Sequence, residues 1–359
     1  MCHKRRGCSN IVNPQSLPSN AMRLTLVLPN LLDAPPAALA AVNAPALARL
    51  LLGAEAILEP DGPLAVACAN IGIAKQNDWP VAPWLARAAG IEPGSRYWLC
   101  AAPVTLDVGR VEVRLAGVVS DLDAAEGIAL LSSLRAQFAS DGIEFLDDGP
   151  GRWWVTLAEP QQLETSPPDA VLGKPLIAHL PRGADAARWR RWQSEIQMLL
   201  FEHPVNRLRE ESGQLPVNDV WMWGGGTLRA ADPAAPVAAV FTQTPLLRDL
   251  ARAVGANPVT VPSSFAAFRE APPATSALVW LDALNALDPQ EQLIAFDTNW
   301  AAPLERALDK HELELRLVFA GSGTALAFTP HASGPMQRLR RRWSPPPSLS
   351  VLLAALADA

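Results

Sequence analysis

The sequence contains few of the residues from which metal and nucleophile sites are usually built. Only five histidines and four cysteines occur among 359 residues, and a single tyrosine stands beside twelve tryptophans. No two histidines have metal-ligand spacing on one helix, and neither an HExxH nor a GxSxG pattern is present. We therefore expect the histidines to be isolated structural or surface residues.

Charge of one sign and long apolar runs are also scarce. Charged residues make up 18% of the chain and the net charge is −6, which argues against a nucleic-acid-binding protein. The one dense basic run, residues 338–342, fits a solvated helix end better than a phosphate-binding patch. No apolar run approaches the roughly 20 residues that a membrane span needs, so we expect no membrane interaction.

The first residues and the cysteines bear on the cellular compartment. Residues 1–21 are basic and polar without an apolar core, so they are not a signal peptide, and we expect a disordered or mis-called leader ahead of Met22. Cys68 and Cys100 lie in apolar surroundings without CxxC spacing, which predicts buried free thiols. Free thiols suit a reducing compartment, and we expect a cytoplasmic protein.

Strand-like and helix-like segments alternate along the chain, which predicts an α/β fold with a mainly parallel sheet flanked by helices on both faces. The expected strands are residues 24–28, 96–101, 111–115, 143–146, 153–157, 217–222, 238–242, 259–261, 277–281 and 313–319. The expected helices are residues 36–52, 79–89, 123–138, 185–201, 245–254, 298–310 and 348–356. Residues 95–160 are interpreted as a smaller inserted α+β domain, and residues 22–94 and 161–359 as the core.

The helix expected at residues 123–138 carries the clearest local signals. Glu126 follows Asp123 by three residues, which is the spacing of a capping box. Apolar residues recur at helical spacing and predict one buried face: Ile128, Leu131, Leu134 and Phe138.

Two glycine-containing segments are candidate ligand sites. Gly224, Gly225 and Gly226 follow Trp221 and Trp223 at the end of an expected strand, and their backbone N–H groups could cradle an anion. The alternative is a turn that packing under the tryptophans requires. In the second segment Ser322 lies between two glycines after a strand. No histidine is paired with it in the sequence, so a tight turn is the better interpretation.

A longer ordered pattern surrounds the first of these segments, with HPVNRLR at residues 203–209 and GQLPVNDVWMWGGG at residues 213–226. It resembles the HPVNxxR…GxxPxNxxWxWGxG segment of the archaeal-type, cofactor-independent phosphoglycerate mutases of the alkaline phosphatase superfamily. Fainter similarity extends to residues 26–30, 44–50, 121–131, 143–145, 152–155 and 244–261. The resemblance implies an alkaline-phosphatase-like core with an inserted domain, isomerase activity and two divalent metals such as Mn or Zn.

The chain departs from the family where the family places its metal ligands and nucleophile. Asn30 stands where the resemblance implies a ligating Asp after the first strand, and an amide does not supply an anionic oxygen. Residues 67–70 contain no serine at the place of the nucleophile. Asp282 and the residues after it include no histidine, and residues 320–323 replace an Asp-His pair. We therefore expect neither the metals nor any catalytic or metal-ligating residue to be retained.

Three hypotheses about function remain open. The first is a phosphoglycerate mutase-like protein without metal-dependent phosphoryl transfer, which binds a small phosphorylated ligand or a protein partner in a regulatory role. The second is an active mutase or phosphatase with a rebuilt site, and the third is a binding module that presents tryptophans such as Trp153, Trp154 and Trp189. The candidate ligand-binding residues are Asn30, Arg209, Asn218, Trp223, Gly224, Gly225, Gly226, Asp282 and Ser322.

Overall fold

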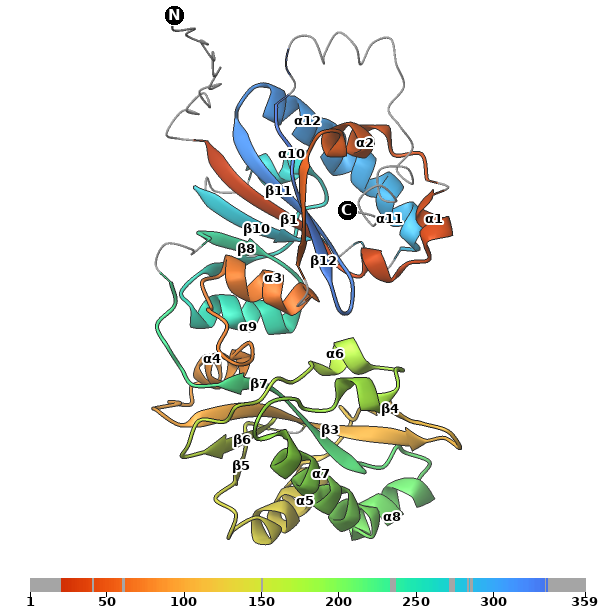
Figure 1. Ribbon diagram of the computed structural model, residues 1–359, viewed down its shortest axis with the longest axis vertical. Coiled ribbons are helices and arrows are strands. Elements are labelled where there is room, and N and C mark those ends of the chain that lie inside the picture. The colour runs from red at the N-terminus through yellow and green to blue at the C-terminus, as the bar shows by residue number, and fades with distance from the viewer. Residues whose placement is uncertain are drawn as a thin grey trace, which may run out of the picture.

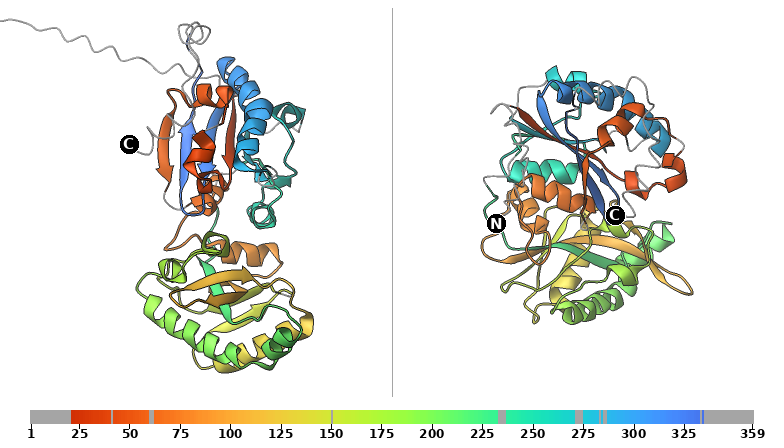
Figure 2. Two further views of the ribbon diagram at one scale, coloured as in Figure 1. Left: turned by 90° about the vertical axis from the view of Figure 1, so that its right-hand side faces the viewer. Right: turned by 45° about the horizontal axis from the view of Figure 1, so that its top comes forward.

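The computed structural model describes residues 21–334, apart from residues 41, 60–61, 150, 233–236, 271–274, 283, 285–286 and 333. The expected leader up to residue 20, the basic run at 338–342 and the helix expected at 348–356 lie outside the described residues. The described chain forms two sheets, each with its own helices, stacked along the long axis of the molecule (Figures 1 and 2). The α/β fold class predicted from the sequence is confirmed.

The first sheet, sheet A, has seven strands and is mainly parallel. The central strand β1 pairs in parallel with β10 and β11, and β8 and β9 continue the parallel part beyond β10. The other two strands, β12 and β2, are antiparallel and form one edge. In sheet order the strands are β2 (Glu55–Glu59), β12 (Ala325–Thr329), β11 (Leu313–Ala320), β1 (Met22–Leu28), β10 (Ser276–Trp280), β8 (Ala239–Phe241) and β9 (Asn257–Val259).

Helices cover both faces of sheet A, which explains why its central strands are nearly continuous apolar runs. Leu24 and Leu26 point into one apolar cluster, and Val27 points into the other. The first cluster lies under α1 (Pro36–Ala40), α2 (Pro45–Leu51), α10 (Phe265–Glu270), α11 (Pro289–Phe296), a π-helical turn η4 (Asp297–Ala301) and α12 (Ala302–Asp309). The second lies under α3 (Gly62–Asn70), α4 (Val81–Ala88) and α9 (Pro245–Ala253).

The second sheet, sheet B, has five antiparallel strands. They are β4 (Val113–Val118), β3 (Tyr97–Val108), β6 (Trp153–Leu157), β5 (Glu144–Asp147) and β7 (Asp219–Gly226), the last of which pairs with β3. Its helical elements are α5 (Ala124–Gln137), α7 (Ala186–Phe201), α8 (Pro204–Glu211), α6 (Pro168–Val171) and η2 (Leu176–His179). How the chain divides into domains stays a prediction, but sheet B itself extends past residue 160 because β7 completes it.

The two sheets share part of one apolar core. Trp98, Cys100 and Trp154 from sheet B pack in the same cluster as Trp84 of α4 and Val27 of sheet A.

Cys68 and Cys100 are buried free thiols, as predicted. Burial raises the pKa of both thiols far above the ordinary range, so they are inert at neutral pH. No helix in the described part of the chain is long and apolar enough to cross a membrane.

Among the local predictions, the capping box is confirmed and two others are wrong. Asp123 caps α5 and forms the predicted capping box with Glu126. The helix expected over residues 36–52 is instead two helices, because Pro45 begins a new first turn. Ile128 was expected on the buried face of α5 but is 64% exposed, and Leu130 is buried instead.

Candidate functional site

Four parallel strands of sheet A end at the same edge, which we call the strand-end edge. β1, β8, β10 and β11 run in one direction, so their carboxyl ends lie side by side. Asn30, Asp282 and Ser322 each lie two residues beyond the end of their strand. The carboxyl edge of an open parallel sheet is where such folds bind ligands, so the structure brings three of the predicted site residues to one edge.

Asn30 occupies a left-handed backbone conformation with φ of 61° at the start of the turn η1 (Leu31–Asp33). Asparagine tolerates this conformation better than most residues, which gives it a conformational role here. Its side chain is exposed and makes no capping hydrogen bond.

A chain of three side chains joins the strand-end edge to the sheet B unit. The N–H and hydroxyl of Ser322 donate to the Asp33 carboxylate, with the hydroxyl 2.9 Å from Oδ1. Lys174 follows α6, and its ammonium Nζ donates to the Ser322 hydroxyl from the other side. We call Asp33, Ser322 and Lys174 the clasp. The tight turn expected around Ser322 is also observed, because Gly321 N–H donates to Thr324 C=O at 2.9 Å and connects β11 to β12.

Asp282 is tied to the loop after β8 through one of its two oxygens. Oδ2 accepts from Gln243 N–H and Thr244 N–H at 2.7 Å each, and from the hydroxyls of Thr242 at 2.8 Å and Thr244 at 2.9 Å. Oδ1 is buried without a hydrogen-bond partner among the described residues. Asp282 therefore fixes the loop through Oδ2 and leaves one acceptor oxygen unused.

The residues at the strand-end edge do not fit a pair of divalent metal ions. Asn30 offers a neutral amide and Ser322 a hydroxyl, while the Asp33 carboxylate is already paired with Ser322. Two-metal sites need several carboxylate and imidazole ligands that converge on the ions. No group of three His, Cys, Asp or Glu side chains that could hold a metal occurs among the described residues.

The HPVN…R segment lies in the sheet B unit and is used for structure. Arg209 is completely buried and donates to Asp121 Oδ1 at 2.6 Å, Glu126 Oε2 at 2.8 Å and Leu215 C=O at 2.8 Å. This arginine holds the pKa of the Asp121 carboxyl below its usual range. Asn206 and His203 also make hydrogen bonds within the sheet B unit, to Val217 and to Ser133 respectively.

Asn218 extends the pairing of sheet B rather than facing a ligand. Its Oδ1 accepts from Leu106 N–H at 2.7 Å, and its Nδ2 donates to Leu106 C=O at 2.9 Å. The Asn218 side chain thus bonds to both backbone groups of Leu106, as the backbone of a paired strand would. The structure places both Arg209 and Asn218 in the sheet B unit, away from the ends of the sheet A strands.

The three glycines are part of strand β7, so the turn expected after the strand, for an anion or for packing, is wrong. A side chain at Gly225 would collide with the Tyr97 hydroxyl, and one at Gly226 would collide with Pro80. Asp78 Oδ2 accepts from Gly225 N–H at 3.3 Å, and Gly224 N–H donates to Thr165 Oγ1 at 2.9 Å. The glycines are therefore needed for close packing, and two of their N–H groups are already bonded.

Asp78 is a buried carboxylate at the junction of the two units. Besides Gly225, it accepts from Trp79 N–H at 2.8 Å and from the N–H and hydroxyl of Thr165. Burial raises its pKa to about 6, although these hydrogen bonds lower it.

Three residues of these contacts were not predicted from the sequence: Asp78, Asp33 and Lys174. Asp33 follows the first strand by a few residues and could have been found from that position, whereas Lys174 carries no local signal.

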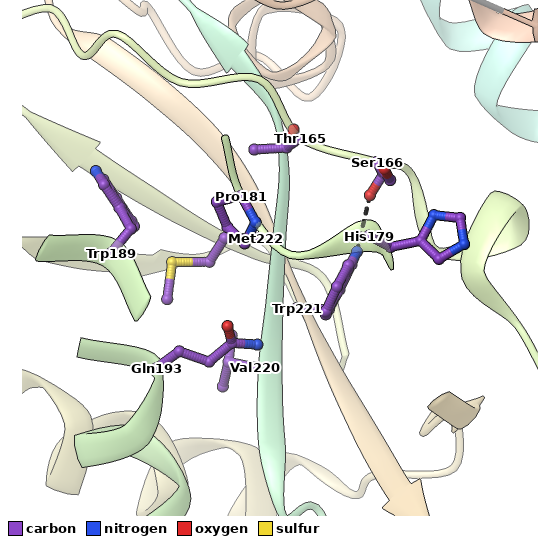
Figure 3. A pocket seen from close by; sticks show the side chains of 9 residues that line it. All are labelled: Thr165, Ser166, His179, Pro181, Trp189, Gln193, Val220, Trp221 and Met222. Carbon is purple, nitrogen blue, oxygen red and sulfur yellow. Dashed lines mark hydrogen bonds between the residues drawn. The ribbon is translucent and has the colours of Figure 1, made fainter. Parts of the chain in front are cut away.

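Most of the tryptophans that the structure describes are buried. Trp153, Trp154 and Trp189 are 2–3% exposed, so the hypothesis of a binding surface built on these tryptophans is wrong. Trp223 is half-buried in β7. Trp221 closes a small cavity and donates its Nε1–H to Ser166 C=O at 2.8 Å (Figure 3). This cavity has room for about a single water molecule, since its volume is near 20 Å³.

Comparison with known proteins supports the resemblance over part of the chain. A 2,3-bisphosphoglycerate-independent phosphoglycerate mutase of Methanothrix thermoacetophila is 35% identical over 103 residues, which are 28% of this chain and 26% of that protein. A protein of the same name from Methanosarcina mazei is 30% identical over 125 residues, 34% and 31% of the two chains. The chain thus spans about a quarter to a third of the length of these curated relatives. The resemblance to this family is confirmed at that level.

A comparison with solved structures gives a weaker similarity, and a comparison with family models gives none. A cofactor-independent phosphoglycerate mutase structure from Thermoplasma acidophilum aligns with 86% of this chain and 90% of its own, at 16% identity and a TM-score of 0.42. No family model matches the sequence.

Proposed function

We propose that this protein is a phosphoglycerate mutase-like ligand-binding or regulatory protein that does not carry out metal-dependent phosphoryl transfer. Its ligand would be a small phosphorylated molecule or a protein partner that meets the strand-end edge. The observation that carries the proposal is the state of the side chains at this edge. Asp33, Ser322 and Lys174 are bonded to one another, and Asp282 holds a loop through Oδ2.

The chemistry of these groups supports binding over catalysis. A phosphoryl-transfer nucleophile has to be activated by a base or a metal beside the reacting phosphorus. The Ser322 hydroxyl donates to Asp33 and accepts from Lys174, and the described residues include no group of metal ligands that would activate it. Lys174, by contrast, can exchange Ser322 for an oxyanion, because a flexible ammonium is a common phosphate ligand.

The proposal is tested by assaying the purified full chain for turnover of 3-phosphoglycerate and of a generic phosphomonoester with added Mn²⁺ or Zn²⁺. The proposal expects no turnover above a matched Ser322→Ala variant. Metal-dependent turnover by the unaltered chain would contradict it. Binding of 3-phosphoglycerate that weakens in Lys174→Ala, without turnover, would support the ligand-binding role.

One observation favours the second candidate, an active mutase or phosphatase with a rebuilt site. Asp282 Oδ1 is buried and has no hydrogen-bond partner among the described residues, so it remains available to a cation or a donor. An Asp282→Asn variant separates the two candidates. It would abolish any turnover if Asp282 serves catalysis, and would change only stability if Asp282 serves the loop.

A further inference from the structure

A surface cavity of about 550 Å³ lies away from the strand-end edge, between the helices α4 and α9. These helices are neighbours on one face of sheet A, between the two sheets in Figure 1. Each contributes its last turn to the cavity, and residues 230–231 after β7 complete it. The cavity is of the size that small-molecule sites have in proteins.

The charged groups that line this cavity are all positive. Arg87 comes from α4 and Arg252 from α9, and none of the lining residues is acidic. A cation in the last turn of a helix is favoured by the helix dipole, which accounts for each arginine alone. It does not account for two helices directing arginines at the same cavity.

Both guanidinium groups can be reached by a ligand. Arg252 is 53% exposed and pairs with Asp249 at 3.1 Å, an exposed ion pair of the kind that contributes little and exchanges readily. Arg87 lies over the Trp84 ring, 5.8 Å from its centroid, and has no carboxylate partner among the residues that the structure describes. The ring holds the Arg87 guanidinium in place without neutralising its charge.

The rest of the lining leaves room beside the two charges. Ala88, Ala231 and Ala253 have small side chains, and Trp84 supplies an apolar surface. We propose that this cavity binds the oxyanion of a small molecule, a phosphate or a carboxylate, between Arg87 and Arg252. Planar guanidinium groups match both kinds of oxyanion with paired hydrogen bonds. The site is separate from the clasp and does not depend on the function proposed for the strand-end edge.

The test is calorimetric titration of the full chain with two probes, inorganic pyrophosphate and citrate, which distinguish phosphate from carboxylate ligands. We expect at least one probe to bind, and binding to weaken about tenfold in Arg87→Ala and in Arg252→Ala, the loss expected for one charge-assisted pair. Arg248→Ala is the matched control, because Arg248 is an exposed arginine of α9 that does not line the cavity. It should bind as the unaltered chain does.

A second variant shows whether a loss of binding comes from the cavity itself or from unfolding of the protein. Ala88→Phe keeps both arginines but places a bulky ring in the cavity beside them, and Ala88 is exposed, so the fold should tolerate it. We expect this variant to lose probe binding while its melting temperature stays unchanged. Equal affinities in Arg87→Ala, Arg252→Ala and Arg248→Ala would overturn the proposal, as would the absence of binding for both probes at about millimolar concentration.

Discussion

Arg209 shows at the scale of one residue why a motif can be shared without a shared site. Its side chain is fully buried and donates to two carboxylates and one carbonyl. In the sequence, the motif around Arg209 suggests ligand binding. In the structure, Arg209 instead holds α8 against the start of α5. The position of Arg209 was predictable, but its partners Asp121 and Glu126 are more than 80 residues away and were not.

Arg209→Ala should lower the free energy of unfolding by about 2 kcal/mol or more, because it removes a fully buried side chain together with its three hydrogen bonds. Arg207 is the matched control: it lies on the same helix, is exposed and donates only to the Glu202 carbonyl. Arg207→Ala should change stability by less than about 0.5 kcal/mol. Urea unfolding of both variants measures the difference, and equal effects would show that the bonds of the buried Arg209 side chain do not stabilise the fold.

Asp219 makes a second residue-scale prediction, on pH dependence. It is completely buried, and burial raises its pKa to about 7 although Gln193 and Gln197 donate to it at 2.9 and 3.0 Å. The folded protein therefore holds a proton that the unfolded chain releases at a lower pH. Stability contributed by this proton is present at low pH and is lost as the pH rises toward about 7.

We expect the free energy of unfolding to fall between about pH 4 and pH 7, and to fall less in Asp219→Asn, which cannot ionise. Asp78 acts in the same direction, since its pKa is raised to about 6, so the Asp219 variant should reduce the slope rather than abolish it. Chemical unfolding at several pH values measures this. An unchanged slope in Asp219→Asn would contradict the assignment, and the exposed-pair variant Asp249→Asn serves as the control.

At the scale of the element, β7 shows how close packing decides the use of glycine. Its glycines lie inside a strand, where glycine is otherwise unfavourable, because α4 and Tyr97 come too close for a side chain.

Gly225→Ala should destabilise the protein by about 2 kcal/mol or more through overpacking. Gly127 in α5 has open space around a would-be side chain. Gly127→Ala should therefore stabilise by about 0.5–1 kcal/mol.

Thermal unfolding of the two glycine variants distinguishes these expectations by sign. A Gly225→Ala variant as stable as the unaltered protein would mean that β7 and its neighbours can move apart at no cost. A destabilised Gly127→Ala variant would mean that the space beside Gly127 is more crowded than the structure indicates.

Elements with strong local signals were predictable, and elements that depend on distant partners were not. The capping box of Asp123 and Glu126 located α5, since both bonds of the box are made within four residues. The short edge strand β2 and the returning strand β12 were missed, because they exist only by pairing with each other and with β11. The role of β7 in sheet B was missed for the same reason, since its partner β3 lies more than 100 residues earlier.

At the scale of the whole molecule, hydrogen bonds that include those of Asp78 and of the clasp join the units of sheets A and B. Asp78 binds Thr165 and Gly225 at the buried junction, and the clasp reaches the strand-end edge from the other unit.

Lys174→Met should release the clasp without unfolding the protein. Hydrogen exchange of residues 172–176 should then become faster while the melting temperature stays nearly constant. The exposed Lys310, which lies 3.9 Å from Glu312, provides the control variant Lys310→Met. Unchanged exchange in Lys174→Met would show that the clasp does not restrain this segment.

The central claim is that the strand-end edge keeps the position of a ligand site but not the ligands of a two-metal centre. It is tested most directly by the metal stoichiometry of the folded full chain, measured by native mass spectrometry after equilibration with Mn²⁺ and Zn²⁺ and removal of the excess. The neutral Asn30 and Ser322, an Asp33 carboxylate bonded to Ser322 and a single unbonded oxygen on Asp282 predict a protein that retains no pair of ions. Two ions retained per chain, and lost in Asp282→Asn, would contradict the account.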